Sequence, residues 1–279
     1  MKKLVLTFAS ALLVGSIALT SCEKQKEAIF DQSAVDNATA DAQFNDLDNI
    51  TTEAMISQES QLGVREVSGE RTSNFRGCGT YTFNTSTKTM TIDFGTGVTC
   101  NDGKTRKGKL IITYTGRYMT PGSVITTTTD NYYVNNVKVD GRKTVTNVTQ
   151  QGGNPKHTVV VADGKLTYAD GSTFTWTTNR TREWLSGSGD LNFTNDVWSI
   201  TGDASGVNRK GKSFVANITN PIIIKAECFA TSGRMPVQGT YSVVAENASK
   251  TVDFGTGACD RTITVTITNV GQFTIGIGD

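Results

Sequence analysis

The amino-acid sequence predicts an all-β protein whose antiparallel meander forms a β-sandwich or a curved half-barrel, preceded by a short N-terminal helix or tether. Polar and apolar residues alternate with a period of two after Arg76, most clearly in RTITVTITN (261–269). No helical period interrupts this region, so short strands joined by turns are expected. Pairs of Asp and Gly, which suit tight hairpin turns, recur at 102–103, 140–141, 163–164 and 170–171.

The first 21 residues have the features of a secretory signal peptide. Lys2 and Lys3 precede an apolar run, 4–19, that is short for a transmembrane helix. The next residues, Leu19-Thr20-Ser21-Cys22, resemble the lipobox of bacterial lipoproteins. The resemblance implies cleavage before Cys22, which would then carry a diacylglyceryl group and an N-acyl chain. We therefore expect an outer-membrane lipoprotein whose partner is the membrane itself, facing either the cell surface or the periplasm.

Residues 22–75 form an acidic tether. They carry 11 acidic and 4 basic residues, whereas residues 76–279 carry 15 acidic and 21 basic residues. Within the tether, apolar residues recur at spacings of three and four and predict an amphipathic helix over 35–55, which Asp36 or Asn37 could cap. The apolar stripe is thin. It favours a spacer that docks weakly on the body, or frays, over a helix that binds a partner.

The β domain is expected over 76–279, and it contains an internal echo. Asp93-Phe94-Gly95-Thr96-Gly97 returns as Asp253-Phe254-Gly255-Thr256-Gly257. Two copies are too few for a solenoid. They predict two related lobes or two similar hairpins in one pair of sheets.

The cysteines other than Cys22 predict disulfides, because their number is even and the compartment is oxidising. Four cysteines allow three connectivities, and the echo favours Cys78–Cys100 and Cys228–Cys259. A zinc site is disfavoured, because the sequence has no C-x-x-C pair and a single histidine. We expect neither a metal nor a cofactor.

The strand expected over 173–185 is a candidate ligand face. If it runs straight, Trp176, Arg180, Arg182 and Trp184 share one side. Tryptophan and arginine on a sheet surface can stack on sugar rings or bind anions. The alternative is that the rings belong to the core and the arginine stems cover their edges.

Two similar basic segments form a candidate anion-binding cluster. An acidic envelope glycan or another anionic envelope component is the expected partner, whereas nucleic acid is excluded by export and by the small net charge. The alternative interpretation is that these basic residues are solvated charges at strand ends that bind no ligand. The residues are Arg106, Lys107 and Lys109 in the first segment and Arg209, Lys210 and Lys212 in the second.

No catalytic constellation can be assembled from the sequence, so we expect no enzyme and no catalytic residue. His157 has no motif around it. Glu183, Asp93 and Asp253 are the acids that could serve glycoside hydrolysis, but the two Asp-Phe-Gly-Thr-Gly segments are more typical of a strand end and its turn.

Beyond the lipobox, the body resembles a set of uncharacterised lipoproteins of Bacteroidota. The resemblance rests on TIDFGTGVTCNDGKTRKGKLIITYTGRY, NYYVNNVKVDGRKTVTN, NRTREWLSG and VDFGTGACD. It implies a Gram-negative envelope protein with an all-β body and carries no known activity. We expect a non-catalytic structural or binding role in the envelope, the alternatives being a surface glycan-binding accessory lipoprotein or a lipid-carrying half-barrel.

Overall fold

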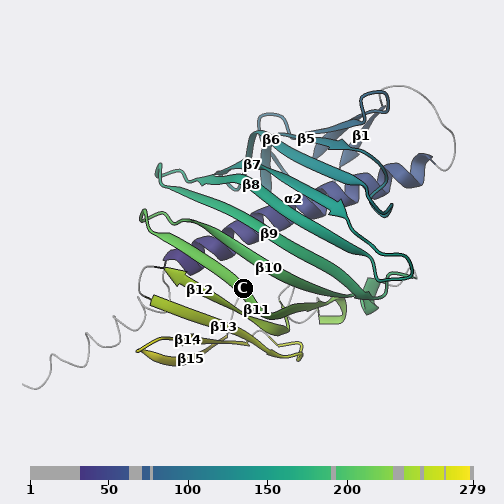
Figure 1. Ribbon diagram of the computed structural model, residues 1–279. Coiled ribbons are helices and arrows are strands. Elements are labelled where there is room, and N and C mark those ends of the chain that lie inside the picture. The colour runs from purple at the N-terminus through teal and green to yellow at the C-terminus, as the bar shows by residue number, and fades with distance from the viewer. Residues whose placement is uncertain are drawn as a thin grey trace, which may run out of the picture.

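The computed structural model describes residues 32–62, 71–75, 78–189, 193–228, 236–245, 248–260 and 262–276. Within these ranges, fifteen strands form one antiparallel sheet, and the helix α2 (Gln32–Leu62) lies across one of its faces (Figure 1). Fourteen strands follow one another in chain order, and β4 pairs with β5 beside this path. The predicted all-β meander is therefore confirmed, as a single open sheet. The strands are β1 (Arg71–Phe75), β2 (Gly79–Asn84), β3 (Thr89–Asp93), β4 (Val98–Thr99), β5 (Thr105–Tyr114), β6 (Val124–Val134), β7 (Val137–Asn147), β8 (Lys156–Thr167), β9 (Thr173–Ser186), β10 (Val197–Val207), β11 (Ser213–Lys225), β12 (Gln238–Ala245), β13 (Ala248–Thr256), β14 (Thr262–Ile267) and β15 (Gly271–Gly276), and two short 3-10 helices are η1 (Phe193–Asn195) and η2 (Ala226–Cys228).

The alternating sequence pattern gives the sheet two unlike faces. We call the face that packs against α2 the inner face and the opposite one the outer face. Along the first half of β9, Phe174, Trp176 and Thr178 are buried on the inner face, while the threonines between them are exposed. Threonine suits this outer position, because its β-branched side chain fits a pleated strand and its hydroxyl stays in water.

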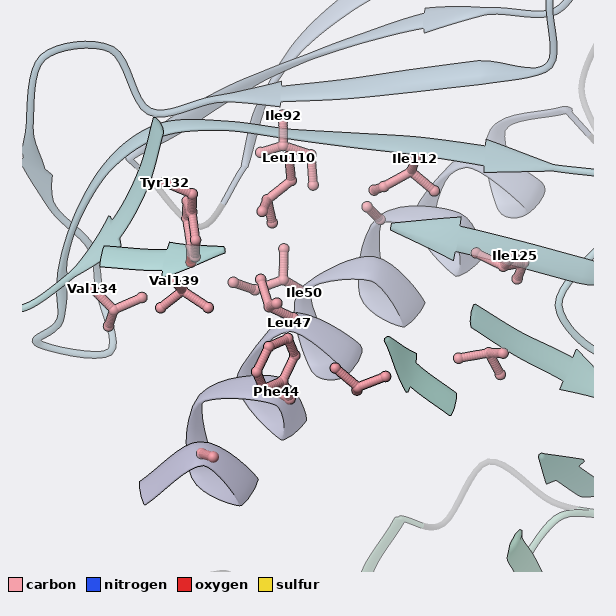
Figure 2. Packing of buried hydrophobic residues seen from close by; sticks show 14 of the residues in the cluster. Phe44, Leu47, Ile50, Ile92, Leu110, Ile112, Ile125, Tyr132, Val134 and Val139 are labelled. Atoms are coloured by element: carbon pink, nitrogen blue, oxygen red, sulfur yellow. The ribbon is translucent and has the colours of Figure 1, made fainter. Parts of the chain in front are cut away.

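The core lies between α2 and the inner face. Phe44, Leu47 and Ile50 of the helix point toward apolar side chains of the sheet, among them Ile92 and Leu110 (Figure 2). All five side chains are at most 2% exposed. Burying each of them stabilises the fold by about 1.5 to 3 kcal/mol.

The helix is a central element of the body, so the expected weakly docked spacer is wrong. It extends beyond the predicted 35–55 at both ends. Its buried residues between Asp36 and Met55 span an arc of about 200° at 100° per residue, more than half of the circumference. Asp46 and Asp48 lie at the two edges of this arc and are buried as well. The sheet therefore bends around the helix and contacts its flanks.

The two echoed segments are similar hairpins at opposite ends of one sheet. In each, the first aspartate accepts a hydrogen bond from the amide two residues later: Asp93 Oδ1, at the end of β3, from the Gly95 amide, and Asp253 Oδ1, within β13, from the Gly255 amide, both at 2.8 Å. A small separate cluster of Val252, Val265 and Ile267 packs under the second copy. The continuous sheet favours the hairpin interpretation of the echo over two separate lobes.

Both expected disulfides are present. Cys78 and Cys100 pair with a Cα–Cα distance of 4.8 Å, and Cys228 and Cys259 with one of 5.0 Å. The first ties the start of β2 to the end of β4, and the second ties η2 to the segment after β13.

The predicted signal peptide and Cys22 lie outside the described residues. Among the helices of the described ranges, none combines the length and the apolarity needed to cross a membrane.

Candidate functional site

The inner face of β9 is the predicted ligand face, and α2 covers most of it. Trp176 is 2% exposed. Its ring stacks on Phe44 at a centroid distance of 5.3 Å, and its indole N–H donates a hydrogen bond to Asn37 Oδ1 at 2.9 Å. The tryptophan is therefore a core residue whose polar atom is satisfied by the helix, which corrects its assignment to a ligand face.

The two arginines of that face also contact the helix. Arg180 pairs with Asp41, and Arg182 pairs with Asp48 and donates a hydrogen bond to the Tyr118 hydroxyl. Trp184, further along the strand, is half-buried and packs against Trp198 with a centroid distance of 5.9 Å. In the structure, three of the four predicted ligand residues are thus engaged by α2 rather than open to a sugar or an anion.

Asp48 is the centre of the most deeply buried ion network. Its carboxylate lies 3.0 Å from Lys143 Nζ, and the two side chains are 4% and 3% exposed. Lys143 also donates a hydrogen bond to the backbone carbonyl of Phe44 at 2.9 Å. Although burial raises the pKa of Asp48, the charges of Arg182 and Lys143 outweigh it and hold that pKa well below 3.8. Burial lowers the pKa of Lys143 from 10.5 to about 8, against the opposing charge of Asp48.

A second network lies on the other flank of the helix. The Arg106 guanidinium, 0% exposed, pairs with Asp46 at 2.8 Å and with Asp102 at 2.6 Å. Lys104 Nζ reaches the same Asp46 carboxylate at 2.9 Å. Hydrogen bonds from Arg106 lower the pKa of Asp102 to about 2, against the effect of burial. Arg106 is thus committed to two carboxylates of this chain.

The predicted basic cluster is divided by the fold. Arg209 pairs with Asp36, with Nε 2.8 Å from Oδ1, and lies over the Tyr168 ring. Because Asp36 and Asp46 are ten residues apart on the helix, the partners of Arg209 and Arg106 are separated by about 15 Å. The six basic residues therefore do not form one patch.

The remaining basic residues of the two segments lie nearer the surface. Lys107 is placed over the Tyr133 ring at 3.9 Å, and Lys109 forms a half-exposed ion pair with Asp93 at 2.9 Å. Lys210 and Lys212 are exposed in the turn between β10 and β11. Among the six predicted residues, Lys109, Lys210 and Lys212 are thus the exposed ones.

His157 is a buried packing residue. Its ring stacks on Tyr118 at a centroid distance of 4.5 Å, and it is 4% exposed. Burial, and then the charge of Arg182, lower its pKa below 6.5. Glu183, the other isolated candidate for acid–base chemistry, pairs with Lys156 at 2.8 Å on the surface.

Within the described ranges, Glu227, Cys228 and Cys259 bring potential metal-ligand atoms together. Both sulfurs are joined in a disulfide, so neither is a thiolate that could bind a metal.

Sequence reasoning did not identify the acidic residues of the helix as the partners of the inner-face cations. Asp41, Asp46 and Asp48 each pair with a basic residue of the sheet, and Asp36 pairs with Arg209 of the β10–β11 turn. One signal was present in the sequence: alternation places Arg180 and Arg182 on the same side of β9 as two core aromatics, and a cation in that position needs an acidic partner.

Comparisons with protein-family models, with curated proteins and with solved structures gave no match to this chain. The resemblance to lipoproteins of Bacteroidota accordingly stays a prediction.

Proposed function

We propose that this protein is an outer-membrane-anchored lipoprotein with a non-catalytic structural or binding role in the cell envelope. The observation that carries the proposal is that the chain's own helix occupies the inner face of the sheet, where a half-barrel would hold a ligand. Trp176 and Phe44 fill the middle of this space, and ion pairs close it on both sides.

The buried charges support a structural task for these side chains. Arg106, Lys143 and Arg182 each lie within 3.0 Å of a helix carboxylate and are at most 24% exposed. A cation used to bind an external anion has to be free of such a partner or exchange it at a large energetic cost. Partner binding is therefore expected on the outer face and on the turns.

The occupied inner face also affects the two alternative functions, a lipid carrier and a glycan-binding accessory lipoprotein. A lipid carrier would need α2 to leave the sheet, because the helix side chains fill the space in which acyl chains would lie. A glycan-binding accessory protein would have to use the surface beyond the helix, where Trp184 and Trp198 are half-buried.

Metabolic labelling tests the anchor. Cells that express the full chain or its Cys22→Ala variant are fed an alkyne analogue of palmitate, and the protein is then purified. We expect label on the wild type and none on Cys22→Ala. Absence of label from the wild type would contradict the lipoprotein assignment.

Mass spectrometry under native conditions tests the filled inner face. We expect the soluble Cys22→Ala form to be free of bound lipid, because α2 occupies the space. Co-purified phospholipid in stoichiometric amount would instead favour the carrier alternative.

A further inference from the structure

The start of α2 is fixed at one end of the sheet. Asn208 Nδ2 donates a hydrogen bond to Ser33 Oγ at 2.8 Å, and the Arg209 backbone amide donates one to Asp36 Oδ2 at 2.8 Å. Both partners belong to the turn between β10 and β11. Alternate turns of an antiparallel meander lie at the same end, so the β6–β7, β8–β9 and β14–β15 connections and the last residues of β12 are there too. We call this end the helix-start end.

The length of the preceding chain places the helix-start end near the membrane. Nine residues lie between Cys22, the expected acylation site, and Gln32, the first residue of α2, which makes ten Cα–Cα steps. Even fully extended, they reach only about 35 Å. The 14 residues of β9 extend about 46 Å away from this end, so the opposite turns lie further from the anchor. This step rests on the proposed lipoprotein function.

The helix-start end also carries accessible positive charge. Lys165 near the end of β8 and Lys210 in the β10–β11 turn are exposed, and neither makes an ion pair among the described residues. Asp170 is the exposed acid in the adjacent β8–β9 turn, and it accepts hydrogen bonds from the amide and hydroxyl of Ser172. Two acids lie beside Lys165: Asp163, two residues earlier, is exposed, and Asp140 is its cross-strand partner.

Exposed apolar side chains accompany these lysines. Val207, Val215 and Val244 are 38%, 46% and 42% exposed. Val215 and Val244 are directly paired between β11 and β12, and Val207 lies at the β10–β11 turn. A fourth exposed valine, Val270, lies in the β14–β15 turn, 44% exposed. Cations beside a small apolar surface match the interface of an anionic membrane, where headgroups attract the charge and the apolar groups leave water.

We infer that the helix-start end is a membrane-docking surface that binds anionic lipid headgroups next to the acyl anchor. Lys165 and Lys210 supply the electrostatic attraction, and the valines of β10–β12 contact the interfacial region. Each lysine near such a surface strengthens binding by about five-fold. The anchor holds the chain at the membrane, and this surface sets how the body is oriented on it.

The test uses the unacylated full-length chain, Cys22→Ala, so that the anchor does not contribute. Its co-sedimentation is measured with vesicles of phosphatidylglycerol and phosphatidylcholine and with vesicles of phosphatidylcholine alone. We expect binding to the anionic vesicles that weakens strongly between about 0.05 and 0.5 M salt, because the interaction is screened. Failure to bind anionic vesicles at low salt would overturn the inference.

Matched charge reversals separate a defined surface from a general effect of net charge. Lys165→Glu/Lys210→Glu alters the helix-start end, whereas Lys88→Glu/Arg117→Glu alters exposed residues of turns at the opposite end by the same charge. We expect the first pair to weaken binding at least about 25-fold and the second less than about three-fold. Equal losses would overturn the inference, and circular dichroism of both variants checks that they are folded.

The palmitate labelling keeps this inference distinct from the proposed function. Acylation at Cys22 without binding of the Cys22→Ala form to anionic vesicles would overturn the docking surface and leave the lipoprotein function standing. Vesicle binding without acylation would overturn both the lipoprotein assignment and the orientation argument that rests on it.

Discussion

Replacing Asp48 by Asn tests the ion network that attaches α2 to the sheet. The substitution keeps the size of the side chain and removes its charge. Two cations, Lys143 and Arg182, then remain next to each other without the carboxylate that balances them. The Lys143 side chain is only 3% exposed. Removing one partner of a buried ion pair costs about 3 to 5 kcal/mol. We expect a loss of that size in the free energy of unfolding, measured by urea denaturation of the Cys22→Ala form at neutral pH.

The matched control is Asp93→Asn. Asp93 also pairs with a lysine, at 2.9 Å, but the Lys109 and Asp93 side chains are 47% and 39% exposed. An exposed pair contributes about 0 to 1 kcal/mol, so the control should lose no more than that. Adding Lys143→Met to Asp48→Asn should recover part of the loss, because the uncompensated charge of Lys143 is then gone while that of Arg182 remains. Equal losses in Asp48→Asn and Asp93→Asn would refute the reasoning.

Three further predictions concern the same body. An NMR titration of His157, the single histidine of the sequence, should give a pKa below 6.5. The free energy of unfolding should fall as the pH drops from 6.5 through that pKa, because in this range the unfolded chain binds a proton that the folded chain does not. Gly206→Ala should clearly lower the urea concentration at the unfolding midpoint, because the added Cβ would lie 1.9 Å from a carbonyl oxygen of β9. The control Gly189→Ala should have little effect, because an added Cβ there has no atom within 4 Å. Removing the Cys78–Cys100 disulfide by paired serine substitution should lower the free energy of unfolding by about 3 kcal/mol in urea denaturation without reductant.

The strands and turns could be predicted from sequence because their causes are local. Alternation fixes which side of β9 carries Phe174 and Trp176, and Asp93 and Asp253 each accept a hydrogen bond from the amide two residues away. The disulfides followed from the echo, which gives Cys100 and Cys259 corresponding positions and so favours one disulfide for each copy.

The burial of α2 could not be predicted in the same way, because its causes are remote in sequence. Asp46 and Asp48 make the apolar stripe look thin, and their burial depends on Arg106 and Arg182, which lie 60 and 134 positions further along the chain. Only the folded sheet brings these cations to the two flanks of the helix. The predicted ligand face was wrong for the same reason: Trp176 and its neighbouring arginines had the composition of a binding surface, but their partners were in the tether.

Hydrogen exchange followed by mass spectrometry on the soluble Cys22→Ala form tests most directly whether α2 is part of the core. If the helix fills the inner face, the amides between Ala40 and Met55 exchange as slowly as those of β9, because both open only when the body unfolds. Exchange of these helix amides within seconds, while β9 stays protected, would show that α2 leaves the sheet freely, and would contradict the account.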